Sequence, residues 1–167
     1  PAGHVLQDAQ GENRAASTGT YVVHTATPST WITVVSATIT PSNVASKILI
    51  NFTANLSGDG GSTALHILRD STQIGQADAA GSRVRSTIAN GHWEGGSGTY
   101  DMANYNGVFL DDISDSPAWT SGAITYYIKI SKYNAGTYRI NRSEAHRDNA
   151  AGYDGVSASY IVLQEIA

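Results

Sequence analysis

Apolar and polar residues alternate with a period of two along most of this chain, which is the pattern of β-strands with two unlike faces. The clearest case spans residues 47–56, with one face made of Ile48, Ile50, Phe52, Ala54 and Leu56, and the other of Leu49, Asn51, Thr53 and Asn55. Residues 4–7, 20–24, 31–39, 64–69, 82–88, 100–110, 123–133 and 137–141 are interpreted as further strands. Because turn residues separate these stretches and none has a sustained 3.6-residue period, we expect an all-β fold of about ten strands.

The last stretch, residues 155–166, has the same alternation and ends one residue before the end of the sequence. A chain end frays unless a sheet holds it, so we expect this run to be a strand in the middle of a sheet. We place Tyr160 and Val162 in the core. The opposite face ends in Ile161 and Leu163 and is too apolar for open water, so we expect another subunit to cover it.

Composition limits the classes of partner. The 167 residues contain 10 Lys and Arg against 14 Asp and Glu, and this net charge of -4 argues against a nucleic-acid or anionic-membrane partner. The chain has no cysteine, so disulfides and thiolate metal sites are excluded. We expect neither a membrane span nor a secretory signal, because no apolar run is long enough and no basic-then-apolar start is present. We expect one domain, residues 1–167.

The sequence offers little catalytic chemistry. Asp111, Asp112 and Asp115 form the densest carboxylate group, but they precede a Ser-Pro turn and lack calcium-loop spacing, so we interpret them as a solvated turn. The five histidines have no local metal-ligand spacing. His66 lies between Leu65 and Ile67, and we interpret it as part of a polar sheet face or a subunit contact. There is no nucleophile elbow or phosphate-binding loop, so we expect no enzyme and no cofactor.

Aromatic residues in polar loops are the other candidates. Trp93 follows His92 in a glycine-rich loop, Trp119 follows a Ser-Pro turn, and Tyr153 lies between Gly and Asp. Such rings can stack on a sugar beside hydrogen-bonding side chains, so we consider His92, Trp93, Trp119 and Tyr153 as contacts for a glycan or a protein partner. The alternative is that each tryptophan closes the end of a sandwich or packs on a neighbouring subunit.

Several short segments occur in an order that resembles a module of structural proteins from tailed bacteriophages. They cover nearly the whole chain: Gly3-His4-Val5-Leu6-Gln7, Ile39-Thr40-Pro41-Ser42, Ser46-Lys47-Ile48-Leu49-Ile50, Leu68-Arg69-Asp70, Ile74-Gly75, Ala79-Ala80-Gly81-Ser82-Arg83, Asp115-Ser116-Pro117, Asn141-Arg142-Ser143 and Glu165-Ile166. The resemblance implies a virion surface protein with a trimeric jelly roll similar to tumour-necrosis-factor and complement-type heads. Such modules decorate capsids or form the receptor-binding tips of tail fibres. No coiled-coil heptad or collagen-like repeat is present, which favours a compact knob.

Two hypotheses follow from these observations. The first is a non-enzymatic homotrimeric knob, attached to capsid or tail proteins at the virion surface, with Ile161, Leu163 and His66 at the trimer interface and a host-surface glycan as a further partner. The second is a monomeric carbohydrate-binding module or lectin domain that uses Trp93 or Trp119. A hydrolase is a weaker third hypothesis, because no acid/base pair can be named.

Overall fold

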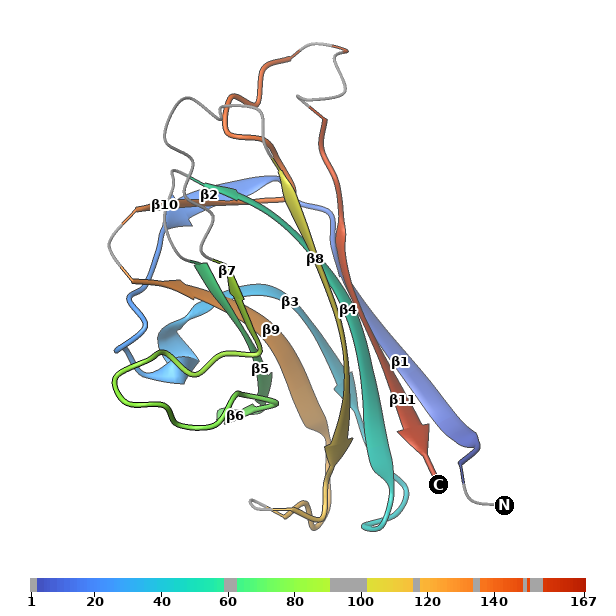
Figure 1. Ribbon diagram of the computed structural model, residues 1–167. Helices are drawn as coiled ribbons and strands as arrows, with labels where there is room; N and C mark the ends of the chain where they lie inside the picture. The colour runs from blue at the N-terminus through green and yellow to red at the C-terminus, as the bar shows by residue number, and fades with distance from the viewer. Residues whose placement is uncertain are drawn as a thin grey trace.

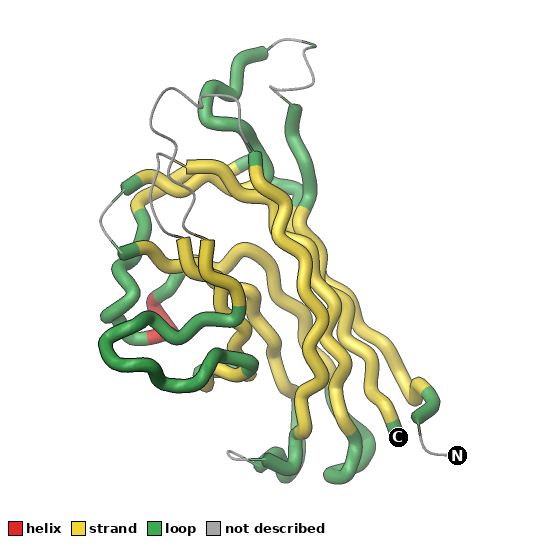
Figure 2. The backbone as a smooth tube through the Cα atoms, viewed as in Figure 1, coloured by secondary structure: helices red, strands yellow, loops and turns green. Residues whose placement is uncertain are grey.

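The computed structural model describes residues 3–58, 63–90, 102–115, 118–133, 136–148, 150 and 155–167. Within them the fold is all-β, as predicted, and its regular structure consists of strands and one short 3-10 turn, η1 (Pro28–Thr30). The strands form two curled antiparallel sheets, an arrangement consistent with a β-sandwich (Figure 1, Figure 2).

One sheet has six strands among the described residues, in the order β1-β11-β4-β10-β2, with β8 paired to β4. Their bounds are β1 (Val5–Asn13), β2 (Ser17–Thr20), β4 (Lys47–Gly58), β8 (Ala103–Asp112), β10 (Thr137–Ile140) and β11 (Ser159–Ile166). β11 pairs with β1 on one side and with β4 on the other. The final strand therefore lies inside a sheet, as the sequence predicted.

The other sheet has five strands in the described part of the chain, in the order β3-β9-β5-β6, with β7 paired to β5. Their bounds are β3 (Ile32–Ile39), β5 (Thr63–Arg69), β6 (Thr72–Ile74), β7 (Ile88–Asn90) and β9 (Ile124–Lys132). β5 and β6 form a hairpin, and Asp70 in its turn has a positive φ of 53°. Asp tolerates this left-handed conformation better than most residues.

The core fills the space between the sheets with side chains that share one face of each strand. β4 contributes Ile48, Ile50 and Phe52, whereas Asn51 and Thr53 point outward, as the alternation in the sequence predicted. Burying such large apolar side chains contributes about 1.5–3 kcal/mol each and is the main force that holds the sheets together.

Along one side the two sheets approach each other closely, between β1 and β3. A Cβ atom at Gly11 would lie 1.8 Å from the Ser36 carbonyl oxygen, so no other residue fits at this position. Two residues further along, the Asn13 amide nitrogen donates a hydrogen bond to the Val34 carbonyl at 2.7 Å. Glycine and asparagine thus fix the joint between the sheets.

Three predicted segments differ from the structure. The strand predicted at residues 4–7 is longer in the structure, because residues 8–13 each pair with β11 and extend β1. Residues 20–24 and 82–88 were expected to be strands. Instead, residues 21–31 and 75–87 lie along the outer face of the five-stranded sheet and contain only isolated bridges, turns and η1 before β7 begins (Figure 1). We call these two stretches the covering segments.

Candidate functional site

The two sheets differ in what lies on their outer faces. Over the five-stranded sheet, the covering segments bury side chains that point away from the core, including His66 and Leu68 of β5. Over the six-stranded sheet, Asn55 and Ser57 at one end of β4 are buried, but most outward side chains of β8, β4 and β11 are not buried by any described segment. We call this surface the bare face, and its members are Leu49, Asn51, Thr53, Asn106, Val108, Leu110, Tyr160, Val162 and Gln164.

Strand register arranges these residues in three rows. Each row crosses β11, β4 and β8 in turn: Tyr160, Thr53 and Asn106; then Val162, Asn51 and Val108; then Gln164, Leu49 and Leu110. None of the nine carries a charge. The nearest ion pair joins Lys47 Nζ to Asp112 Oδ2 at 2.9 Å, one row beyond.

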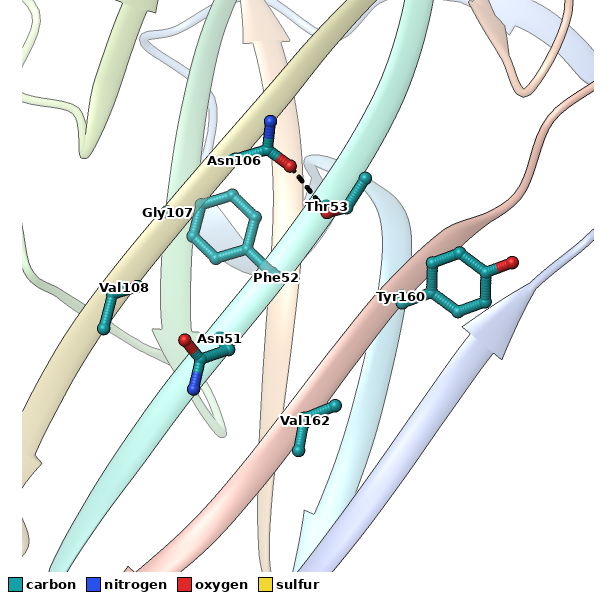
Figure 3. Close-up of a pocket in the computed structure, with 8 residues that line it drawn as sticks. All are labelled: Asn51, Phe52, Thr53, Asn106, Gly107, Val108, Tyr160 and Val162. Atoms are coloured by element: carbon teal, nitrogen blue, oxygen red, sulfur yellow. Dashed lines mark hydrogen bonds between the residues drawn. The ribbon is translucent and has the colours of Figure 1, made fainter.

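A groove of about 480 Å3 runs along the first two rows, and Figure 3 shows the side chains that line it. Apolar surface is well exposed here: Val108 is 70% exposed and Tyr160 46%. Below the groove, the Phe52 ring fills the space beside Gly107, where a Cβ atom would lie 2.5 Å from the ring. The sheet is therefore tightly packed beneath a surface that stays open.

Polar side chains of β4 and β8 form a hydrogen-bonded ladder at one end of the groove. The Asn104 amide donates to Asn55 at 2.7 Å, the Asn106 amide donates to Asn104, and the Thr53 hydroxyl donates to Asn106 at 2.6 Å. Among the described residues, the Asn51 amide and the Tyr160 hydroxyl have no hydrogen-bond partner. These two groups remain available to a ligand or to a neighbouring chain.

The predicted orientation of β11 is wrong. Ile161 and Leu163 are fully buried in the subunit core, whereas Tyr160 and Val162 point outward to the groove. The pairing register with β4 explains this, because Ile161 is opposite Phe52 and Leu163 is opposite Ile50, both core residues. Ile161 and Leu163 therefore present no surface to another subunit. If β11 contacts another subunit, it would do so with its other face, which carries Tyr160 and Val162.

His66 does not form an exposed contact either. It is fully buried on the outer face of β5, where its ring stacks on Trp31 with centroids 3.8 Å apart. It therefore belongs to the packing between the covering segments and the sheet.

Of the four predicted aromatic and histidine contacts, only Trp119 lies within the described residues. Trp119 is partly buried against the core, and its indole nitrogen donates to the Gly122 carbonyl at 3.0 Å. This matches the alternative in which a tryptophan closes the end of the sandwich. His92, Trp93 and Tyr153 lie outside the described residues.

The aspartate group near β8 has structural contacts, and Asp111 is buried, which corrects the interpretation of a solvated turn. Asp111 Oδ2 accepts hydrogen bonds from the Tyr126 hydroxyl at 2.6 Å and from Arg69 Nη1 at 3.1 Å. Burial raises the pKa of Asp111, although Tyr126 and Arg69 oppose this effect. Asp112 is partly exposed, and hydrogen bonds from Ser114 and Lys47 lower its pKa to about 2.

The described residues hold no group of three or more side chains suited to a metal ion. Ser131 lies between two histidines, as in some nucleophilic sites, but it is fully buried and no substrate could reach its hydroxyl. Within the described part of the chain, no helix has the length and apolar character needed to cross a membrane.

No model of a known protein family matches the chain, and no curated protein matches it as a relative.

Proposed function

We propose that this protein is a non-enzymatic structural knob on the surface of a tailed-bacteriophage virion, and that it assembles as a homotrimer through the bare face. In this assembly the outer side of β8, β4 and β11 lies towards the three-fold axis. The groove residues of each subunit pack against those of its neighbours.

The bare face is the observation that carries this proposal. It combines exposed Val108, Leu110 and Tyr160 with neutral amide side chains and lacks charge. Cores of protein interfaces are depleted of charge and enriched in aromatic residues, and in a closed three-fold ring each subunit offers such surface to two neighbours. A second copy of the chain meets this requirement, because the face offers apolar side chains together with the unpartnered Asn51 amide and Tyr160 hydroxyl.

Strand order supports a jelly roll of the tumour-necrosis-factor type as the subunit fold. Two four-stranded sets face each other, β1-β11-β4-β8 and β3-β9-β5-β6. In a jelly roll, eight strands wound as two Greek keys make two such sheets. The paired strands β2 and β10 and the short β7 would be additions to that plan.

The virion location rests on the ordered short segments that resemble phage structural modules. Within that class, the knob is either a capsid decoration protein, which cements neighbouring capsid proteins, or the receptor-binding tip of a tail fibre. The position of its gene, beside a major capsid protein or among tail genes, distinguishes the two. Two direct assays measure binding of the purified protein, one to capsids that lack it and the other to host cells.

Light scattering after size-exclusion chromatography tests the assembly. We expect a mass near three times 17.6 kDa for the wild-type protein and about 17.6 kDa for Val108→Asp, with unchanged circular dichroism. Val84→Asp is the matched control, because Val84 is 42% exposed on a covering segment away from the bare face. A wild-type monomer would overturn the trimer, and a trimeric Val108→Asp would overturn its placement.

A second candidate function is a monomeric carbohydrate-binding module. The groove favours it because its lining includes both an exposed Tyr160 ring and the free Asn51 amide, groups that can stack on a sugar and hydrogen-bond its hydroxyls. A glycan array with wild-type protein and Tyr160→Ala, Trp93→Ala and Trp119→Ala variants tests this function. Monomeric protein with glycan binding lost in one of these variants would favour the module over the knob.

A further inference from the structure

A continuous chain of hydrogen bonds, buried at its centre, joins the covering segments to the five-stranded sheet. The Gln73 amide nitrogen contacts His66 Nδ1 at 3.0 Å, and His66 Nε2 contacts Ser131 Oγ at 2.7 Å. The same Ser131 oxygen contacts His24 Nδ1 at 2.7 Å. His66 and Ser131 are fully buried, so these four side chains must satisfy one another.

The direction of every bond in this chain follows from one fixed donor. The Gln73 amide nitrogen also donates to the Arg85 carbonyl at 2.8 Å, which can only accept, so this nitrogen is a donor towards His66 Nδ1 as well. Nδ1 therefore carries no proton, and Nε2 carries it and donates to Ser131. The Ser131 hydroxyl then donates to His24 Nδ1.

This arrangement has no position for an additional proton. On His66 the proton would go to Nδ1 and face the Gln73 N–H donor. On His24 the proton would go to Nδ1, which then could no longer accept from the Ser131 hydroxyl. The Ser131 oxygen already accepts a hydrogen bond from His66. Protonation of either histidine therefore places two hydrogen-bond donors against each other or leaves one donor without an acceptor. A missing hydrogen bond is costly where the groups are shielded from water.

The charged side chains on the surrounding elements are mostly cationic. Lys129 is the cross-strand neighbour of His66 on β9, and Lys132 is on the same strand. The covering segment of residues 75–87 carries Asp78, Arg83 and Arg85, and Arg69 of β5 points to the opposite side, to Asp111. Residues 21–31, β6 and β3 carry no charged side chain apart from His24.

The same chain anchors the covering segment of residues 21–31. Its other attachments include the Trp31 ring stacked on His66, a hydrogen bond from Lys129 Nζ to the Ser29 carbonyl at 2.8 Å, and backbone bonds to Lys132. At the start of the segment, Tyr21 also bonds to Gly136 and Thr63. The Trp31 stack is made with the histidine site itself, and the Ser29 bond is made with the cation opposite it. Loss of the neutral histidines would weaken the attachment as a whole.

We propose that the Gln73–His66–Ser131–His24 chain is an acid-sensitive latch, which holds residues 21–31 on the sheet at neutral pH and releases them when the histidines are protonated. The latch acts on the opposite side of the molecule from the bare face. It therefore does not depend on the function proposed above.

The sign of the pH dependence follows from the histidine pKa values. Burial lowers the pKa of His66 from 6.5 to about 3, with the charge of His24 adding to the effect, and burial also lowers the pKa of His24. The released state binds protons at pH 6.5 and the closed state does not. The latch is thus fully stable above pH 6.5 and weakens as the pH falls towards 3, and His66 alone favours release about 30-fold between pH 8 and pH 5.

Hydrogen exchange on the full chain, corrected for intrinsic rates, tests this proposal. We expect the protection of amides in residues 22–31 to fall about 30-fold or more between pH 8 and pH 5, while that of β11 and β4 changes far less. His66→Gln should lose most of this pH dependence. His146→Asn, at an exposed histidine with φ of 43°, should retain it.

Nitrogen NMR of the wild-type imidazoles keeps the proposal testable if His66→Gln does not fold. His66 should stay neutral and protonated on Nε2 at pH 5 wherever the segment is in place. The latch is refuted if His66 titrates near pH 6.5 with residues 22–31 still protected. It is equally refuted if these residues lose no more protection than β11 does.

Discussion

The two outer faces of this molecule are made from similar strands, but they differ in how far other described segments of the chain cover them. On the five-stranded sheet, residues 21–31 and 75–87 bury Leu68, His66 and Ser131, and a chain of directed hydrogen bonds satisfies the His66 ring and the Ser131 hydroxyl. On the six-stranded sheet, Val108, Tyr160 and the neighbouring amides stay exposed.

This difference shows how a covered face and an open face can be distinguished. Polar groups that the chain itself covers need partners of fixed direction, because water cannot replace a missing bond. Polar groups on an open face need only be neutral and adaptable, such as the Asn51 amide and the Tyr160 hydroxyl, because water or an arriving surface can satisfy them. Substitutions on each face should therefore differ widely in their cost to the folded subunit.

The largest effect is expected at Leu163, which points to the core from the strand that also supplies the bare face. Leu163→Asp places a charge among fully buried apolar side chains and should lower the free energy of unfolding by about 5 kcal/mol or more. Urea denaturation followed by circular dichroism measures this. A folded monomer of this variant would mean that the core does not include Leu163.

On the covered face, Trp31→Ala should be the next most damaging change. The ring is 5% exposed and stacks on His66, so its removal leaves a cavity beneath residues 21–31 and should cost about 3–5 kcal/mol. Thermal and urea unfolding check the value. A loss below about 1 kcal/mol would mean that the segment contributes little to stability, as for a surface substitution.

Ser131→Ala is a smaller change on the same face. It leaves His24 Nδ1 and His66 Nε2 without their shared partner and should cost about 1–3 kcal/mol. Ser82→Ala, at an exposed position of residues 75–87, is the matched control and should change stability by less than about 0.5 kcal/mol. Equal stabilities of the two variants would contradict the burial of the hydrogen-bond chain.

The smallest effect on the isolated subunit is expected on the bare face. Because Val108 is 70% exposed, Val108→Asp should change the unfolding free energy of the dissociated subunit by no more than about 0.5 kcal/mol, even where it abolishes assembly. Unfolding at protein concentrations too low for assembly isolates this quantity. A large loss would show that some part of the chain covers the face after all.

Much of the fold could be predicted from period-two alternation. The strand at residues 47–56 was assigned with the correct core face, because its apolar residues are large and its outward residues are mostly polar. In β11 both faces carry apolar groups, and the choice between Val162 and Leu163 depends on the pairing register with β4, which the sequence does not specify. β11 was therefore predicted as a central strand, but with its faces exchanged.

The site was less predictable for the same reason. The groove combines Asn51 of β4 with Val108 of β8 and Tyr160 of β11, residues that become neighbours only through cross-strand pairing. The hydrogen-bond chain of His24, His66 and Ser131 likewise joins a covering segment to two strands, with 107 positions between His24 and Ser131. The sequence did indicate one member of this chain. His66 interrupts an apolar run, where neither a charged nor an exposed side chain would be expected.

The place of β11 between β1 and β4 has a consequence for how the chain folds. Gln7 and Glu165 are 158 positions apart, yet the Gln7 amide donates to the Glu165 carboxylate at 2.6 Å across two paired strands. During synthesis β1 and one edge of β4 remain without their partner until β11 has left the ribosome. Closing such long loops is slow, so we expect folding on a millisecond-to-second scale that begins only after translation of this region ends. Until then the exposed strand edges are open to aggregation, and expression at lower temperature or with a chaperone should raise the soluble yield.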